Sequence, residues 1–95
     1  MSNFSLGGLN NMPKISEFYG ISIYLYSDHL PPHIHIYYKN IDYRYNLNTG
    51  EFLDKAPKTL RKLINIWYNE HKVKLLEAWE LMQTKREVLL IEPLE

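Results

Sequence analysis

Three of the four histidines of the chain lie close together, beside an aspartate and two consecutive prolines. They occur in the segment Asp28-His29-Leu30-Pro31-Pro32-His33-Ile34-His35. If His33 begins a β-strand, the two-residue period places His33 and His35 on the same face of that strand. Proline fixes its own φ and keeps the residue before it extended, so the two prolines should form a stiff turn that presents Asp28 and His29 near the strand. The segment therefore predicts a preorganised site.

Two imidazoles on one strand face could cleave RNA without a metal ion. One would deprotonate the 2′-hydroxyl and the other would protonate the leaving 5′-oxygen, because both groups titrate near neutral pH. In this interpretation His33 and His35 are catalytic and Asp28 orients them. A guanidinium binds phosphate oxygens in a bidentate manner and tyrosine stacks on unpaired bases. The expected substrate-binding residues are Arg44, His29, Tyr24 and Tyr26.

The same residues also suit two other roles. His33, His35 and Asp28 could bind zinc or another divalent metal ion, with His29 as an alternative third ligand. The histidines could instead be structural, with hydrogen bonds that fix the proline turn. The tyrosine-rich strands would then form a surface that binds another protein. The sequence leaves these alternatives open, with a cofactor-free catalytic pair as the first hypothesis.

Length and composition indicate one small domain. The chain has 95 residues, 45% of them hydrophobic, and 11 basic side chains balance 11 acidic ones. This neutral charge provides no general attraction for nucleic acid. Cysteine is absent and no apolar run is long enough to span a membrane, so we expect a cytoplasmic protein. Residues 1–12, rich in glycine, asparagine and serine, are expected to be a flexible leader before a single domain at residues 13–95.

The first half of that domain has the pattern of a small antiparallel sheet. Apolar and polar residues alternate over residues 21–26 and 42–47, with a strand expected from His33 to Tyr38 between them. Lys39-Asn40 and Asn48-Thr49-Gly50 provide turn residues, and a short strand at residues 51–53 follows. The prediction is three to four strands, with an apolar run at residues 88–91 as a C-terminal fifth.

A helical period begins after Pro57, which suits a first helical position. One unbroken helix of about 28 residues would measure roughly 42 Å, and a four-stranded sheet is only about 20 Å wide. We therefore expect a break or sharp bend near residues 69–72. The predicted fold class is α+β, with two helices packed on one face of the sheet. Trp67 and Trp79 are expected in the core.

Several motifs resemble a known bacterial family. They are Pro13-x-Ile15-x-x-Phe18-Tyr19-Gly20-Ile21, the Asp28-His29-x-Pro31-Pro32-His33-x-His35 segment, Thr49-Gly50-Glu51, the helical stretch with Trp67 and Trp79, and Ile91-Glu92-Pro93-Leu94. Together they resemble the domain of unknown function 4160 family. The chain departs from the family pattern at residues 37–40, where its relatives tend to carry glycine and small residues.

The resemblance implies a small α+β domain that is commonly encoded beside another short protein, as in a toxin–antitoxin pair. It favours the toxin half of such a pair, with ribonuclease activity at the histidines. The expected partner is a small cognate antitoxin, with RNA as a candidate substrate and a homodimer as a candidate assembly. The alternatives are a protein-binding module, such as the antitoxin itself, or a metal-binding protein.

Overall fold

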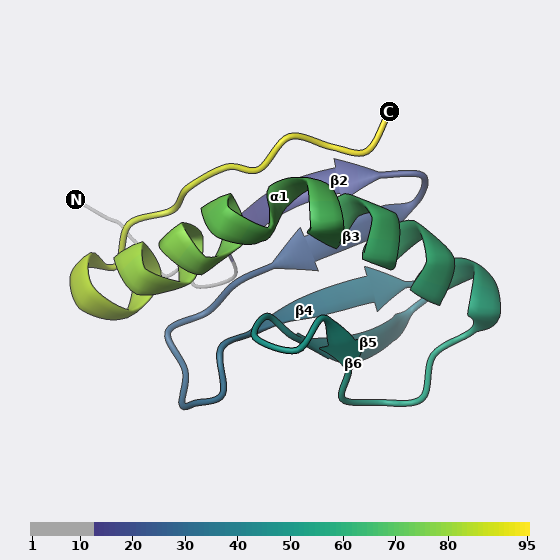
Figure 1. The fold of residues 1–95 in the computed structure, drawn as a ribbon, viewed down its shortest axis with the longest axis horizontal. Helices are drawn as coiled ribbons and strands as arrows, with labels where there is room; N and C mark the ends of the chain where they lie inside the picture. Colours follow the sequence, from purple (N-terminus) through teal and green to yellow (C-terminus); the bar gives the residue numbers. More distant parts are fainter. Residues whose placement is uncertain (1–12) are drawn as a thin grey trace.

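The computed structural model describes residues 13–95, so the leader predicted at residues 1–12 lies outside the described residues. Five antiparallel strands form one sheet in the order β2-β3-β4-β5-β6. A single long helix, α1, lies across one face of this sheet (Figure 1). The strands and helix are β2 (Lys14–Phe18), β3 (Ile21–Tyr24), β4 (His33–Tyr38), β5 (Ile41–Asn46), β6 (Glu51–Phe52) and α1 (Lys58–Lys85). The predicted α+β class and antiparallel sheet are confirmed.

Short turns fix the register of the sheet. Lys39 and Asn40 both have positive φ, at 51° and 66°. Two such residues match the right-handed twist of the flanking strands, as in type I′ hairpins. The turn pairs Tyr37 with Asp42, and His35 with Arg44. At the next turn, the Asn46 side chain accepts hydrogen bonds from the backbone N–H groups of residues 48 and 49. The predicted turns at residues 39–40 and 48–50 are confirmed.

The core lies between the sheet and α1. Alternate strand residues face the helix, so Ile34 and Ile36 are fully buried together with Tyr45. The Tyr45 ring packs against Tyr68 of α1 at 5.3 Å between centroids. Trp67 and Trp79 are buried as predicted. Because the isoleucines of β4 occupy the helix side, its histidines must face the other side of the sheet.

The prediction of two helices is wrong, since α1 is one helix of 28 residues. His71, within the predicted break, does have non-helical backbone angles, φ −125° and ψ 19°, and the helix continues past this kink. The prediction was wrong because it took the width of the sheet as the limit on the length of the helix, whereas α1 also covers residues outside the sheet. Its C-terminal half packs on the 25–32 connection through Gln83 and on His33 through Trp79, so these residues do not project into solvent.

The predicted C-terminal strand is also wrong, because the fifth strand is the N-terminal β2 and residues 88–91 form no strand. Among the described residues, one backbone hydrogen bond joins this segment to β2, from the Ile91 N–H to the Ile15 carbonyl, and one bond is too few for a strand ladder. Trp67 Nε1–H donates to the Glu92 carbonyl and ties the same segment to α1. Within residues 13–95, α1 is too polar to cross a membrane.

Candidate functional site

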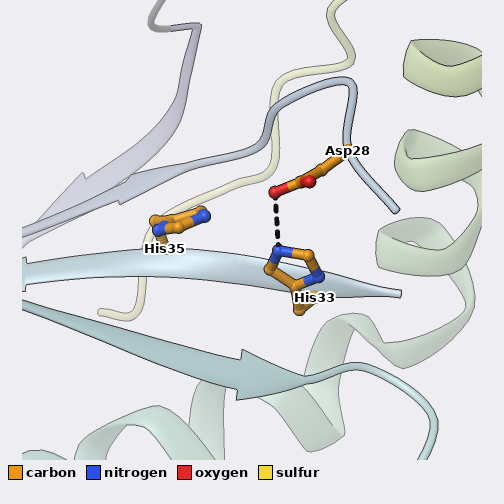
Figure 2. Close-up of side chains that lie close together, drawn as sticks. All are labelled: Asp28, His33 and His35. Atoms are coloured by element: carbon orange, nitrogen blue, oxygen red, sulfur yellow. Dashed lines mark hydrogen bonds and ion pairs between the residues drawn. The ribbon is translucent and has the colours of Figure 1, made fainter. Parts of the chain in front are cut away.

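The candidate site lies on the face of β4 that carries His33 and His35. Figure 2 shows both rings on the same side of β4, with Asp28 above them. The two ring centroids are 5.3 Å apart. The sequence-based prediction that these histidines share a face is therefore confirmed. The side chains are enclosed, with exposed fractions of only 6% for His33 and 14% for His35.

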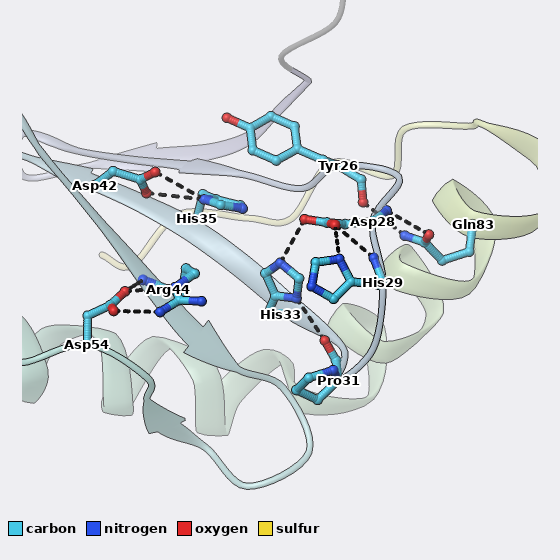
Figure 3. Close-up of polar contacts among 10 residues, drawn as sticks. All are labelled: Tyr26, Asp28, His29, Pro31, His33, His35, Asp42, Arg44, Asp54 and Gln83. Carbon is cyan, nitrogen blue, oxygen red and sulfur yellow. Dashed lines mark hydrogen bonds and ion pairs between the residues drawn. The ribbon is translucent and has the colours of Figure 1, made fainter.

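Asp28 is held over the histidines by the connection between β3 and β4. Gln83 of α1 fixes this connection twice, because its Oε1 accepts the Asp28 N–H at 3.0 Å and its Nε2 donates to the Tyr26 carbonyl at 2.9 Å (Figure 3). The backbone N–H of His29 donates to the Asp28 carboxylate and lowers its pKa, with smaller contributions from the His29 and His33 side chains. The carboxylate is thus favoured in its charged form.

The contacts of His33 fix where its proton lies. Nδ1 is 2.7 Å from the Pro31 carbonyl oxygen, which can only accept, so Nδ1–H is the donor. In the neutral ring Nε2 then carries a lone pair, yet it lies 3.2 Å from Asp28 Oδ2. Two acceptors at this distance need a cation between them, and either a proton or a metal ion satisfies that need.

His35 has a similar arrangement with one difference. Its Nδ1 lies 3.2 Å from both carboxylate oxygens of Asp42, so Nδ1–H is again the donor. Its Nε2 is buried and has no hydrogen-bond partner among residues 13–95. In Figure 3 the ring nitrogen of His35 on the far side from Asp42 faces Asp28 and His33. An unpaired buried acceptor costs about 1–3 kcal/mol, so this atom should have a ligand.

The three side chains converge. One ligand atom from each of Asp28, His33 and His35 lies within 4.8 Å of the other two. Both imidazoles donate Nδ1–H to an oxygen atom and direct Nε2 toward the same region. Histidines that bind metal ions are almost always oriented by such a hydrogen bond from the other ring nitrogen. The residues therefore fit a divalent metal ion.

The region that carries this geometry matches a protein-family model. The family model described as "Domain of unknown function (DUF4160)" matches residues 20–80, which is more than half of the chain and includes Asp28, His33 and His35. The chain belongs to the DUF4160 family. This confirms the resemblance seen in the sequence. No curated protein and no solved structure matched the chain.

The expected substrate-binding residues of the DUF4160 domain lie at different distances from Asp28, His33 and His35. The Tyr26 ring packs on His35 at 4.5 Å between centroids, and Tyr24 lies beside Tyr26 at 6.4 Å. His29 projects from the loop, with 88% of its side chain exposed and Nδ1 2.7 Å from Asp28 Oδ1. The Arg44 guanidinium makes a bidentate contact with Asp54, so it is already engaged.

Charge around the DUF4160 site favours a cation over a polyanion. Three carboxylates, those of Asp28, Asp42 and Asp54, are drawn in Figure 3 with one guanidinium, that of Arg44. Arg44 is paired with Asp54, which leaves Asp28 and Asp42 to set the local potential at the histidines. The negative potential of fixed carboxylates attracts cations to such a region and repels phosphate groups.

Sequence reasoning missed two residues of the site. Asp42 could have been found, because a two-residue turn at Lys39-Asn40 places it opposite Tyr37, two residue pairs from His35 and therefore on the same face of the sheet. Gln83 gave no signal, since it lies 55 residues from Asp28 and a single glutamine in a helix is an ordinary surface residue. Contacts between residues so far apart in the sequence depend on where the C-terminal end of the helix lies in the folded domain.

The Arg44–Asp54 pair leads to a prediction about acid stability. Arg44 lowers the pKa of Asp54 in the folded protein below 3.8, so the ionised carboxylate stabilises the fold above the unfolded pKa and this contribution is lost as the pH falls toward the folded pKa. Asp54→Asn should therefore destabilise the domain at about pH 6 and have a smaller effect near pH 3. Urea unfolding at both values measures this. An equal loss at both would contradict the electrostatic origin.

Proposed function

We propose that the DUF4160 domain binds one divalent transition-metal ion through Asp28, His33 and His35. The observation that carries this proposal is the shared direction of the two Nε2 lone pairs toward one carboxylate. A proton between His33 and Asp28 would satisfy only that pair and would leave the buried His35 Nε2 without a partner. A single metal ion satisfies all three groups.

Distances and ligand types favour zinc. Zinc binds imidazole nitrogen and carboxylate oxygen at about 2.0–2.2 Å, so two ligands in a tetrahedral site are about 3.3 Å apart. His33 Nε2 and Asp28 Oδ2 are already 3.2 Å apart. The widest separation among the three ligand atoms is at most 4.8 Å, and a small rotation of side chains would close it. The set lacks thiolates and contains two imidazoles, which suits zinc, cobalt or nickel better than magnesium or calcium.

Three protein ligands leave a coordination position for water. Catalytic zinc sites have this composition, whereas structural zinc sites use four protein ligands. A zinc ion held by these three residues would lower the pKa of a bound water and so supply a nucleophile near neutral pH. We therefore propose metal-dependent hydrolysis as the reaction class, on the open face of the sheet beside Tyr24 and Tyr26.

The direct test is metal stoichiometry. Chelator-stripped protein should take up one zinc ion per chain in equilibrium dialysis, measured by elemental analysis. His35→Gln and Asp28→Asn should each reduce this uptake. Arg44→Gln is the matched control, because Arg44 lies beside His35 on the neighbouring strand and its guanidinium binds Asp54. Equal zinc uptake by wild type and His35→Gln would contradict the proposal.

A metal-independent ribonuclease is the second candidate, and the His33 contact favours it. If a proton lies between His33 and Asp28, His33 is an imidazolium that can act as an acid, and the unpartnered Nε2 of His35 can act as a base. The domain would then be the toxin of a cytoplasmic toxin–antitoxin pair. The acidic surroundings and the engaged Arg44 make this candidate the weaker one.

One experiment separates the two candidates. The protein is expressed alone in a bacterium, and growth and RNA integrity are followed with and without the His33→Ala,His35→Ala change. The purified protein is then assayed on RNA in a chelator. Cleavage that persists in chelator and needs both histidines would favour the ribonuclease over the metal centre. The antitoxin partner and the homodimer stay predictions until such an activity is measured.

A further inference from the structure

The exposed histidine of the loop is the one imidazole in the cluster without a fixed place. His33 packs against Trp79 and His35 packs against Tyr26, so the surroundings hold both rings. His29 has no comparable packing, and 88% of its side chain is exposed. Its ring is held at one point, the contact of Nδ1 with Asp28 Oδ1. Turning this ring therefore breaks one hydrogen bond and loses little packing.

His29 is also close to the proposed metal position. Its Nδ1 lies 2.7 Å from Oδ1 of Asp28, and the other oxygen of that carboxylate faces His33. The His29 and His33 ring centroids are 6.3 Å apart, only slightly farther than the 5.3 Å between His33 and His35. A rotation about the His29 side-chain bonds can thus bring a ring nitrogen to the open side of the centre, away from the sheet.

Metal binding changes what Asp28 offers His29. The free carboxylate is a strong acceptor for Nδ1–H. When Asp28 donates electron density to a metal ion, it becomes a weaker acceptor, while the metal provides a new bond for an imidazole lone pair. The exchange of one hydrogen bond for one coordination bond favours the rotated ring.

We propose that His29 is a movable fourth ligand that closes the metal centre and is displaced when a substrate or another small anion binds the ion. This inference rests on the proposed function, because it requires metal at Asp28, His33 and His35. It assigns the site a resting state with four protein ligands and an active state with three. The fixed histidines provide affinity and His29 controls access to the open position.

Cobalt(II) and azide test this proposal with the full chain. Cobalt(II) replaces zinc in nitrogen and oxygen sites, and its visible absorption changes with coordination number. In wild type, cobalt should show a four-coordinate spectrum that resists azide. In His29→Ala, azide should shift the bands at much lower concentration. Cobalt affinity should fall by at least the roughly 10–100-fold that loss of an outer-shell partner costs.

His29→Gln distinguishes a ligand from a positioning residue. Glutamine can still donate a hydrogen bond to Asp28 but is a poor metal ligand, so it should resemble alanine in its azide response if His29 binds the ion. If wild type, His29→Gln and His29→Ala all respond equally to azide, the fourth-ligand proposal is overturned while the three-ligand centre stands. If wild type binds no cobalt, both proposals fail. Because His29 is exposed, neither variant should disturb folding, and circular dichroism checks this.

Discussion

Zinc at about a hundred times its dissociation constant should raise the free energy of unfolding of the wild-type domain by about 2.7 kcal/mol. For a domain of this size, that corresponds to a melting temperature higher by roughly 10–20 °C. The shift follows because the folded loop that carries Asp28 and the strand β4 that carries the histidines hold the three side chains close together, so zinc binds the folded chain in preference to the unfolded one. Thermal unfolding of chelator-treated protein, with and without zinc, measures it.

Substitutions around the proposed metal site should reduce the zinc-induced rise in melting temperature to different extents. His35→Ala removes a ligand and should abolish it. Asp42→Asn leaves the ligand in place but weakens the hydrogen bond that orients it, so the shift should return only at about 10–100-fold higher zinc. Asp54→Asn removes a nearby carboxylate that is bound to Arg44, and it should leave the shift unchanged. If Asp54→Asn reduced the shift as much as His35→Ala, zinc would be responding to general negative charge.

The fold was predictable where local signals agree with tertiary packing. Alternation along β4 placed His33 and His35 on one face because Ile34 and Ile36 must be buried on the other. The helix prediction failed because it used the width of the sheet as the limit. The molecule is 42 Å long, which matches a helix of 28 residues, and the 25–32 connection extends the surface beneath it. Such packing involves segments far apart in sequence, which local patterns do not encode.

The residues of the candidate site were predictable from the sequence, but their hydrogen bonds were not. The residue types of Asp28, His33 and His35 identified the cluster. The choice between acid–base chemistry and metal binding depends on which ring nitrogen is free, and that is set by Pro31 and Asp42 through contacts at 2.7 and 3.2 Å. The spacing of residues along a strand predicts which face of the sheet a histidine occupies, but it does not predict the orientation of the imidazole ring.

Gly50→Ala should destabilise the domain by about 2–5 kcal/mol. Gly50 has a φ of +72°, and a left-handed backbone costs a residue with a Cβ roughly 1–2 kcal/mol. The added Cβ would also lie 2.7 Å from Cε2 of Tyr68. Tyr68 is only 4% exposed and its hydroxyl donates to the Leu47 carbonyl, so the ring cannot move away freely. Overpacking of this kind adds about 1–3 kcal/mol.

Gly20→Ala is the matched control for this substitution. Gly20 has nearly the same backbone angle, φ +75°, but nothing lies within 4 Å of its added Cβ. It should therefore show the backbone cost of about 1–2 kcal/mol alone, and the difference between the two variants in urea unfolding isolates the contact with Tyr68. Introducing Gly50→Ala into a Tyr68→Ala background should remove that difference, since the two residues are coupled through the contact. Equal losses for Gly20→Ala and Gly50→Ala in the wild-type background would show that the turn at residues 48–50 shifts to accommodate the methyl group.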